Sequence, residues 1–221
     1  MQNTKVVLIL SGGMDSTTLL YDLLSQGYEV YALGFNYGQR HKKELSCAKE
    51  TCKTFGVPYK VVSLAVLNKV APSSLTRKDI DVPEGRYDAY NMRLTVVPNR
   101  NMVMISIATS YAIGIGATKL FYGAHAGDHV IYLDCRPEFV NAMQKSIKLC
   151  DEHQIDLEAP YLKFDKGDIL ERGIELQVDY SKTWTCYKGK EKACGKCGSC
   201  DERLEAFAKN GVTDPLRYED E

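Results

Sequence analysis

The sequence predicts an α/β protein with a parallel sheet, and two observations support this. Over residues 5–63, continuous apolar runs rich in β-branched residues alternate with segments of helical period. Such runs are typical of strands that are buried on both faces of a parallel sheet. In addition, the first run ends in a glycine-containing turn that leads directly into a helix. Together these features predict repeated β-α-β units.

The expected elements follow from the same periodicities. Strands are expected at 5–10, 29–35, 59–63 and 119–124, with a short one within 155–164. Helices are expected at 16–26, 39–55, 98–116, 136–153, 166–177 and 201–210. The proline-containing, charged stretch 64–97 is expected to form loops and one short helix, and the polar tail 214–221 to be loose. The helix at 98–116 is apolar on nearly every side past Asn101, which predicts a central, buried helix.

Composition narrows the class of protein. The 221 residues suffice for one sizeable domain, and 44% hydrophobic with 26% charged residues is ordinary for a soluble globular protein. The formal net charge of -1 predicts no overall attraction to nucleic acid or to an anionic membrane. No apolar run approaches the ~18 residues of a membrane span, and no signal peptide is recognised, so a cytoplasmic location is expected.

The turn after the first strand, S-G-G-M-D-S at residues 11–16, is called the phosphate loop here. Its two glycines let the backbone approach phosphate closely, and the following helix N-terminus adds unpaired N–H donors. Ser11 and Ser16 can donate from their hydroxyls, while Asp15 beside a polyanion indicates Mg²⁺ between them. The expected ATP-binding residues are Leu10, Ser11, Gly12, Gly13, Met14, Asp15, Ser16, Thr17 and Thr18. The alternative is a plain strand-to-helix turn with Asp15 or Ser16 as its N-cap.

Four of the eight cysteines crowd together, whereas Cys47, Cys52, Cys135 and Cys150 are scattered. The clustered ones are Cys186, Cys194, Cys197 and Cys200. Four thiolates on a glycine-laced segment suit one tetrahedral Zn²⁺ per chain, so this cluster predicts a structural zinc site. An iron–sulfur cluster is the rival interpretation, and a disulfide framework is not expected in a chain without an export signal.

The phosphate loop resembles the pyrophosphate loop of the N-type ATP pyrophosphatases, or PP-loop superfamily, which implies transfer of AMP rather than of the γ-phosphate. The loop and the cysteine cluster together resemble the 7-cyano-7-deazaguanine (preQ0) synthase family. Further resemblance lies in N-Y-G-Q-R-H at 36–41, V-V-P-N-R-N-M at 96–102, Y-L-D-C-R-P-E-F at 132–139 and T-C-Y at 185–187. The resemblance covers nearly the whole chain.

The resemblance implies an adenine-nucleotide alpha hydrolase-like, Rossmann-like core at 1–180, with a C-terminal zinc-binding helical segment at 181–221 packed on the same domain. The implied reaction converts 7-carboxy-7-deazaguanine and ammonia into the nitrile. The carboxylate and then the amide would each be adenylated by ATP, with release of AMP and pyrophosphate. A homodimer that uses small-molecule substrates, with no nucleic acid and no membrane partner, is also implied.

Chemistry suggests roles for polar residues around this site. The expected catalytic residues are Asp15, Ser16, Arg100 and Lys166, and the expected substrate-binding residues are Arg40, His125, Asp128, Asp134 and Arg136. Arg100 can hold a phosphate or a carboxylate in a fork geometry, and Lys166 can neutralise phosphate. Each group also has a simpler interpretation: Arg100 and Lys166 as solvated helix-start charges, Asp134 and Arg136 as a local ion pair, and His125 and Asp128 as loop caps. Cys135 is expected to be a packed or substrate-lining thiol.

Two departures from the familiar family pattern stand out. Asn99 occupies the position of a glycine in V-P-G-R-N, and asparagine tolerates the left-handed conformation that such a turn requires. Residues 127–133 replace an acidic, aromatic and glycine-containing stretch. The alternatives are therefore a related PP-loop enzyme acting on another acceptor, including one that attaches a deazapurine to a macromolecule, or a non-catalytic zinc-bearing module.

Overall fold

The protein's structure, a computed structural model, describes residues 4–86 and 90–219. The expectations for residues 1–3, for 87–89 within the predicted loops, and for 220–221 in the tail lie outside these residues. In the described part of the chain no helix combines the length and apolarity needed to cross a membrane.

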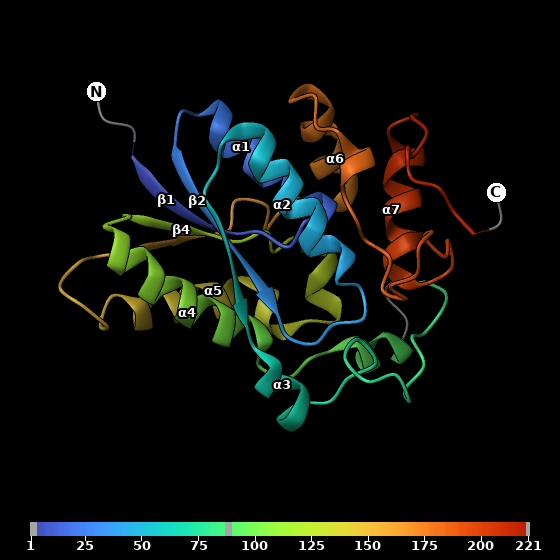
Figure 1. The fold of residues 1–221 in the computed structure, drawn as a ribbon, viewed down its shortest axis with the longest axis horizontal. Coiled ribbons are helices and arrows are strands. Elements are labelled where there is room, and N and C mark those ends of the chain that lie inside the picture. The colour runs from blue at the N-terminus through green and yellow to red at the C-terminus, as the bar shows by residue number, and fades with distance from the viewer. Residues whose placement is uncertain (1–3, 87–89, 220–221) are drawn as a thin grey trace.

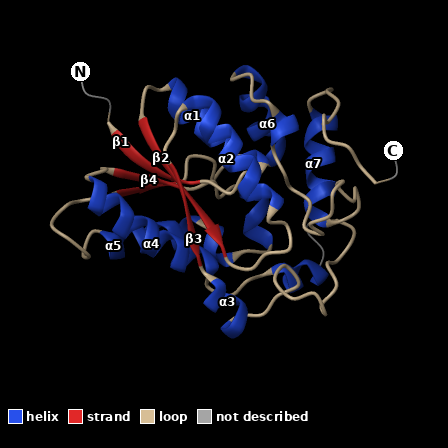
Figure 2. Cartoon of the chain, viewed as in Figure 1, coloured by secondary structure: helices blue, strands red, loops and turns tan. Residues whose placement is uncertain are grey.

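A parallel sheet of five strands forms the centre of the molecule (Figure 1, Figure 2). Its strands are β1 (Lys5–Ile9), β2 (Glu29–Asn36), β3 (Tyr59–Ser63), β4 (Lys119–Phe121) and β5 (Asp156–Glu158). They lie in the order β3-β2-β1-β4-β5, and Val7 of β1 pairs with Tyr31 of β2 on one side and Leu120 of β4 on the other. All four pairings are parallel, which confirms the predicted α/β class.

Helices cover both faces of this sheet (Figure 1). They are α1 (Met14–Ser25), α2 (Lys43–Phe55), α3 (Ala65–Val70), α4 (Arg100–Ile115), α5 (Pro137–Ile147), α6 (Lys166–Glu175) and α7 (Gly198–Lys209). Short 3₁₀ helices are η1 (Tyr90–Thr95), η2 (Ala126–Val130), η3 (Leu133–Cys135) and η4 (Tyr180–Lys182). In Figure 1, α1, α2 and α6 lie on one side of the sheet and α4 and α5 on the other, while α7 stands at the far end beside α6.

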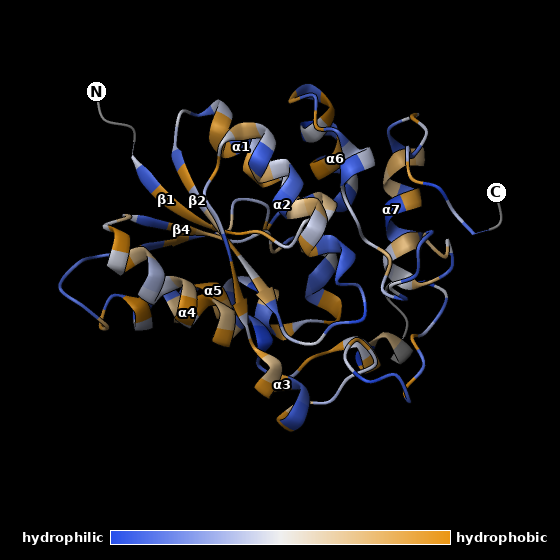
Figure 3. Ribbon diagram, in the orientation of Figure 1, coloured by the Kyte–Doolittle hydropathy of each residue, from blue (hydrophilic) through white to orange (hydrophobic). Residues whose placement is uncertain are grey.

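Strand β1 is buried on both faces, as its sequence predicts. Val6 and Leu8 pack in one core cluster with Leu19 and Leu20 of α1, whereas Val7 packs in the other with residues of α4. Figure 3 shows the hydrophobic colouring along β1. Because successive side chains of a strand point to opposite faces, an unbroken apolar run can fill both cores at once.

The prediction of a wholly buried helix at 98–116 is wrong for one face of α4. Met104, Ile105 and Ala108 are buried, but Met102 and Ser106 are exposed at helical spacing, as are Ser110 and Gly114 one and two turns further on. Ser106 and Ser110 are polar members of this exposed stripe within an otherwise mostly apolar helix. The expected turn before α4 is confirmed, since Asn99 adopts a left-handed conformation with φ 61°.

Two other helices differ from expectation by four residues or more at one end. Helix α2 starts at Lys43 rather than at residue 39, because the side chain of Gln39 accepts a hydrogen bond from Tyr37 N at 2.9 Å and holds a turn there. Helix α5 ends at Ile147, six residues earlier than predicted, and residues 148–150 that follow it are exposed. The loops after β1 and β4 meet at the carboxyl edge of the sheet, where ligands bind in such folds.

Candidate active site

The phosphate loop is a strained, close-packed turn between β1 and α1. Gly12 has φ +93°, and a Cβ there would lie 2.0 Å from the carbonyl oxygen of Glu44, so only glycine fits. The N–H groups of Ser11 and Gly12 point at Ser16 Oγ, at 3.3 and 3.4 Å, and Gly13 N donates to Ser11 Oγ at 3.2 Å. These donors converge on one spot, as an anion-binding turn requires.

The start of α1 offers further donors. Its N-cap residue is Gly13, with no side-chain capping hydrogen bond, so neither Asp15 nor Ser16 acts as the cap. The alternative interpretation of the loop as an ordinary capped turn is therefore not supported. An uncapped helix N-terminus behind convergent loop N–H groups leaves both the unpaired donors and the positive end of the helix dipole facing the pocket.

Lys166 places a buried cation beside the loop. Its Nζ lies 3.0 Å from Asp15 Oδ2 and 2.8 Å from Glu202 Oε2, and the side chain is only 6% exposed. Burial alone would lower the pKa of Lys166, but the charges of Asp15 and Glu202 raise it above its ordinary value. A buried ammonium shared by two carboxylates is not the solvated lysine of the simpler interpretation.

Local sequence fixes where this lysine sits. Asp165 caps α6 by accepting from Asp168 N at 2.9 Å, and the Asp168 side chain accepts in return from Asp165 N. Lys166 is therefore the first residue of a helix whose start is held by a capping box, which points its side chain into the pocket. Glu202 comes from α7, so the ammonium also links α6 to α7.

Asp15 is held ionised and keeps one oxygen free of partners. Burial raises the pKa of Asp15, but the charge of Lys166 and its hydrogen bond to Asp15 outweigh burial and hold the pKa below its ordinary value. Asp15 Oδ1 is buried without a hydrogen-bond partner among the described residues. An ionised, orphaned carboxylate oxygen next to an anion-binding turn fits a ligand to Mg²⁺.

His125 lies behind Asp15 and is fully enclosed. Gly127 N donates to His125 Nδ1 at 3.1 Å, so Nδ1 is the unprotonated nitrogen and Nε2 carries the hydrogen. That Nε2 faces Asp15 Oδ2 at 3.8 Å and Asp128 Oδ2 at 3.5 Å. One ring nitrogen of His125 thus caps the loop and the other faces two carboxylates of the pocket. Contact of His125 with substrate stays a prediction.

Arg100 lies at another part of the same pocket. Its guanidinium stands over the rings of Tyr37 and Tyr132, at 5.5 and 5.9 Å, and makes only long hydrogen bonds of 3.4 Å to Tyr37 Oη and Asn101 Oδ1. Among the described residues no carboxylate lies within the 4.0 Å of an ion pair. A partly buried guanidinium without an anionic partner is ready to receive one.

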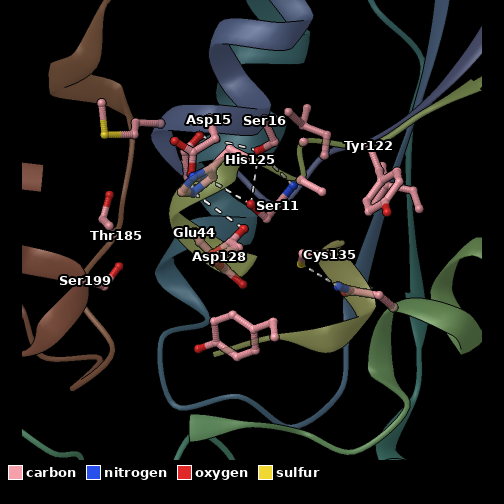
Figure 4. Close-up of a pocket in the computed structure, with 18 of the residues that line it drawn as sticks. Ser11, Asp15, Ser16, Glu44, Tyr122, His125, Asp128, Cys135, Thr185 and Ser199 are labelled. Carbon is pink, nitrogen blue, oxygen red and sulfur yellow. Dashed lines mark hydrogen bonds and ion pairs between the residues drawn. The ribbon is translucent and has the colours of Figure 1, made fainter. Parts of the chain in front are cut away.

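One pocket unites most of these groups (Figure 4). In that view Ser11, Asp15, Ser16 and His125 gather on one side, with Glu44 and Asp128 below them and Cys135 and Tyr122 across the pocket. Burial raises the pKa of Cys135 well above its ordinary value, so its thiol is protonated and is not a ready nucleophile. This agrees with the expected substrate-lining thiol.

Three expected substrate-binding residues do not line the pocket. Arg40 donates to the carbonyl oxygen of Ile80 at 2.7 Å and to that of Arg77. Asp134 Oδ2 accepts from Asn101 N at 3.2 Å and so caps the start of α4, while Arg136 donates to His129 O at 2.8 Å. No ion pair joins Asp134 to Arg136 within the described residues. Their assignment as substrate-binding residues stays a prediction.

Sequence reasoning missed a second group of pocket residues, in the turn after β2 and the first turn of α2. Glu44 and His41 line the pocket, and both are buried. Gln39, 1% exposed, donates to Glu44 Oε1 at 3.0 Å. The segment 36–41 had been noted only as a family-like motif, and Glu44 carries no signal of its own because charged residues recur throughout α2.

The C-terminal segment forms a wall of this pocket. Trp184 N donates to the carbonyl oxygen of Gly12 at 2.9 Å, and Thr185, Tyr187 and Ser199 line the cavity. Arg203 is completely buried and forms a bidentate ion pair with Asp214, at 2.6 and 2.9 Å. The phosphate loop therefore depends on residues far along the chain for its shape.

The four clustered cysteines are buried and converge. Their sulfur atoms all lie within 4.8 Å of one another, with Cys197 and Cys200 Sγ 3.5 Å apart and Cys194 and Cys200 Sγ 4.0 Å apart. A single tetrahedral ion with metal–sulfur bonds of about 2.3 Å holds its sulfurs about 3.8 Å apart, so one ion fits this spacing. A multi-iron cluster is larger than a single ion and would hold the four cysteine sulfurs further apart than they lie here. None of the eight cysteines forms a disulfide.

Backbone donors also suit thiolates at this centre. Lys196 N and Cys197 N point at Cys194 Sγ, at 3.4 and 3.3 Å, and Cys194 N points at Cys186 Sγ at 3.4 Å. Such N–H groups favour the charged form of a sulfur ligand. Cys197 is the N-cap of α7 and Cys200 lies in its first turn, so this centre is at the start of the helix that carries Glu202.

The parallel sheet, the anion-binding turn after β1 and the lysine that faces it define the class of PP-loop ATP-binding α/β proteins. A family profile described as Queuosine biosynthesis protein QueC matches residues 5–211, and the chain belongs to this family. It is 64% identical over 215 residues to 7-cyano-7-deazaguanine synthase of Methanoregula boonei, which covers 97% of this chain and 99% of that protein. It is 60% identical to the enzyme of that name from Caldicellulosiruptor bescii, over 97% of each.

A solved structure supports the fold alone. A 4-thiouridine synthetase, crystallised as an RNA complex with bound ATP, aligns with a TM-score of 0.51 at 17% identity. The alignment covers 93% of this chain and 50% of that protein.

Proposed function

We propose that the protein is an ATP-dependent ligase that converts 7-carboxy-7-deazaguanine and ammonia to 7-cyano-7-deazaguanine, in queuosine-type deazapurine biosynthesis. The observation that carries this proposal is a single pocket with two separate anion sites. One is the phosphate loop with Lys166, and the other is the guanidinium of Arg100, which lies among tyrosines and has no carboxylate partner within the described residues. A reaction between a triphosphate and a carboxylate needs both anion sites, one for each negatively charged substrate. The high identity to enzymes named for this product supports the choice of substrate.

At the phosphate end, the N–H groups of the loop, the hydroxyls of Ser11 and Ser16, and Lys166 would hold the β- and γ-phosphates of ATP. Asp15 would hold Mg²⁺ through its orphaned oxygen. Bound Mg²⁺ supplies neutralisation of the phosphate charge that develops as pyrophosphate leaves. Because the loop donors are fixed before ATP arrives, they stabilise this charge with little reorganisation.

At the other end, Arg100 would orient the substrate carboxylate, and Tyr37 and Tyr132 would pack against the deazapurine ring. A carboxylate oxygen attacks the α-phosphorus of ATP and pyrophosphate leaves. Ammonia then attacks the acyl adenylate, and AMP departs from the resulting amide. The amide oxygen is adenylated in the same way, and loss of AMP and a proton gives the nitrile. His125 and Asp128 would keep Asp15 oriented through both rounds.

The four cysteines would hold one Zn²⁺ with a structural role, since they fill its four positions and leave none for substrate. We further propose that residues 181–221 are a zinc-bearing segment packed on the 1–180 domain, and that the protein works as a cytoplasmic homodimer without nucleic acid. The hydrogen bond from Trp184 to Gly12 supports the packing of the segment.

Product analysis tests this function directly. Purified protein with ATP, Mg²⁺, ammonium and 7-carboxy-7-deazaguanine should yield the nitrile by mass spectrometry, with two AMP and two pyrophosphates for each nitrile. The Asp15→Ala variant should fold and lose turnover. Formation of ADP in place of AMP, or no consumption of the acid by metal-replete protein, would refute the proposal. AMP formation only with another acceptor would indicate a related enzyme.

A further inference from the structure

Glu44 is a buried carboxyl of the pocket that the steps above do not use. Its residue is 8% exposed, yet its carboxylate has no lysine or arginine nitrogen within 4.0 Å among the described residues. Oε1 accepts from Gln39 and lies 3.6 Å from His41 Nε2, and Oε2 has no hydrogen-bond partner in the described part of the chain. Buried carboxyls are normally paired, because an isolated charge in a dry site is costly. A role in the reaction would explain why a carboxyl without a cationic partner is buried at this position.

The position of Glu44 is fixed relative to the phosphate loop. Its carbonyl oxygen occupies the place that a Cβ on Gly12 would take, so the first turn of α2 packs directly on the loop. The side chain lines the same pocket as Ser11 and Arg100. In Figure 4 it lies on the side of Ser11 and Asp128, across from Cys135. It thus stands near the phosphate loop, where adenylation takes place.

The reaction needs a proton acceptor of this kind. When the adenylated amide collapses, the bond from carbon to the AMP oxygen breaks, the carbon–nitrogen triple bond forms, and nitrogen gives up its last proton. In the first half-reaction a second ammonia molecule can accept a proton, but no ammonia is consumed in the second half. A fixed base within the pocket is therefore required most in the second half.

We propose that Glu44 is this general base, taking the proton from the substrate nitrogen as AMP leaves and the nitrile forms. The proton passes to Oε2, and Glu44 returns it to solvent once product departs, so no oxidant or further reactant is needed. This inference rests on the proposed function. The chief competing role for Glu44 is to accept hydrogen bonds from the guanine-like edge of the substrate.

Neighbouring groups leave Glu44 as the one that titrates near neutrality. The titratable and charged groups that face it are Tyr37, His41 and Cys47 from its own segment, Tyr59 from β3 and Arg100 from α4. Burial raises the pKa of Glu44 to about 8. The hydrogen bond from Gln39 and the charge of Arg100 lower this pKa, but burial outweighs them. Burial and then the charge of Arg100 lower the pKa of His41 to about 3, so His41 stays neutral. A base with such a pKa suits proton transfer near pH 7–8.

The test measures the two half-reactions separately with Glu44→Gln, with Glu50→Gln on the exposed side of α2 as the matched control. At saturating ammonium, E44Q should convert the acid to the amide with less than about a threefold loss in rate. Conversion of supplied 7-amido-7-deazaguanine to the nitrile should fall at least ~10²-fold, the usual contribution of a general base. The amide should therefore accumulate in E44Q and not in the control.

Other outcomes would overturn the proposal. A rise in KM with equal loss in both halves would indicate that Glu44 reads the purine edge, and full nitrile formation would exclude the base. If the wild-type enzyme makes neither amide nor nitrile, it is the proposed function that fails. The activity of the wild type in the second half should also rise through an acidic limb that E44Q lacks.

Stability gives a second readout that does not depend on turnover. The folded pKa of about 8 lies above the ordinary value of 4.5, so the stabilisation from protonated Glu44 is full below about pH 4.5 and is lost as pH rises to about 8. Glutamine has no such dependence. The difference in melting temperature, E44Q minus wild type, should therefore increase between pH 5 and 8 and stay constant above pH 8. A constant difference would show that Glu44 already ionises freely, and would remove it as a buried base.

Discussion

Lys166 is the side chain on which the phosphate end of the pocket depends most. It is the buried cation that joins Asp15 of the phosphate loop to Glu202 of α7. Lys166→Met should lower kcat/KM for ATP by roughly 10²–10³-fold, the loss usually seen when one charge-stabilising donor is removed. Steady-state kinetics with varied ATP measure this.

The same change leaves two buried carboxylates without a partner. The free energy of unfolding of Lys166→Met should therefore fall by about 3–5 kcal/mol in urea titrations. Adding Glu202→Gln should recover much of this stability without recovering activity, which separates folding from catalysis. Lys163→Met, at an exposed position just before α6, is the matched control. Wild-type kinetics in the single variant would contradict a role at the phosphates.

Arg100 should matter for one half-reaction more than for the other. Hydrogen bonds to charged groups contribute about 1.5–3 kcal/mol, so Arg100→Met should lower kcat/KM for the carboxylate substrate by roughly 10–10²-fold. The amide has no charge for Arg100 to bind, so kcat/KM for supplied 7-amido-7-deazaguanine should change much less. Comparison of the two substrates measures the difference, with Arg86→Met as a control. Equal losses with both would indicate that Arg100 binds phosphate instead.

At the scale of elements, the cysteine cluster and α7 form one unit. Cys200 and Glu202 lie two residues apart on α7, so an ion held by the thiolates fixes the helix that carries Glu202 to Lys166. Cys197→Ser should leave the protein with less than one zinc per chain. Its melting temperature should fall by at least ~4 °C, the shift that about 1–2 kcal/mol produces in a chain of this size.

Elemental analysis and thermal melts measure both effects, and Cys150→Ser is the matched control because Cys150 is exposed and lies outside the cluster. Retention of a full metal complement by Cys197→Ser would contradict a four-thiolate site. Iron and sulfide in the purified wild type would contradict zinc.

The elements differ in how far the sequence could predict them. The runs that form β1 to β3 are local signals, and they were placed to within a residue at most ends. The start of α2 depends on a hydrogen bond between Gln39 and Tyr37 that no periodicity reports. The exposed stripe of α4 was missed although Ser106 and Ser110 repeat at helical spacing within it. Side-chain contacts and solvent, which decide these features, are not local properties.

At the scale of the whole molecule, the site combines segments that lie far apart in the sequence. The phosphate loop and the cysteine cluster were predictable because glycine and cysteine in those patterns carry a chemical signal of their own. Lys166 was named only as one of two alternatives, since a lysine at a helix start is usually solvated. Glu44 and Glu202 were not predictable, because each lies on a helix with many charged residues and the sequence does not show that the fold buries it. Arg40, Asp134 and Arg136 show the reverse case, since polar groups near the motif bind backbone instead of lining the pocket.

In the proposed reaction both carboxylate oxygens leave the substrate on AMP. The most direct measurement supplies 7-carboxy-7-deazaguanine with oxygen-18 in both carboxylate positions and analyses the nucleotide products by mass spectrometry. If the carboxylate and then the amide attack the α-phosphorus, each nitrile should be accompanied by two AMP molecules that carry one labelled oxygen each. Unlabelled AMP, or label found in phosphate with ADP as the nucleotide product, would contradict the account.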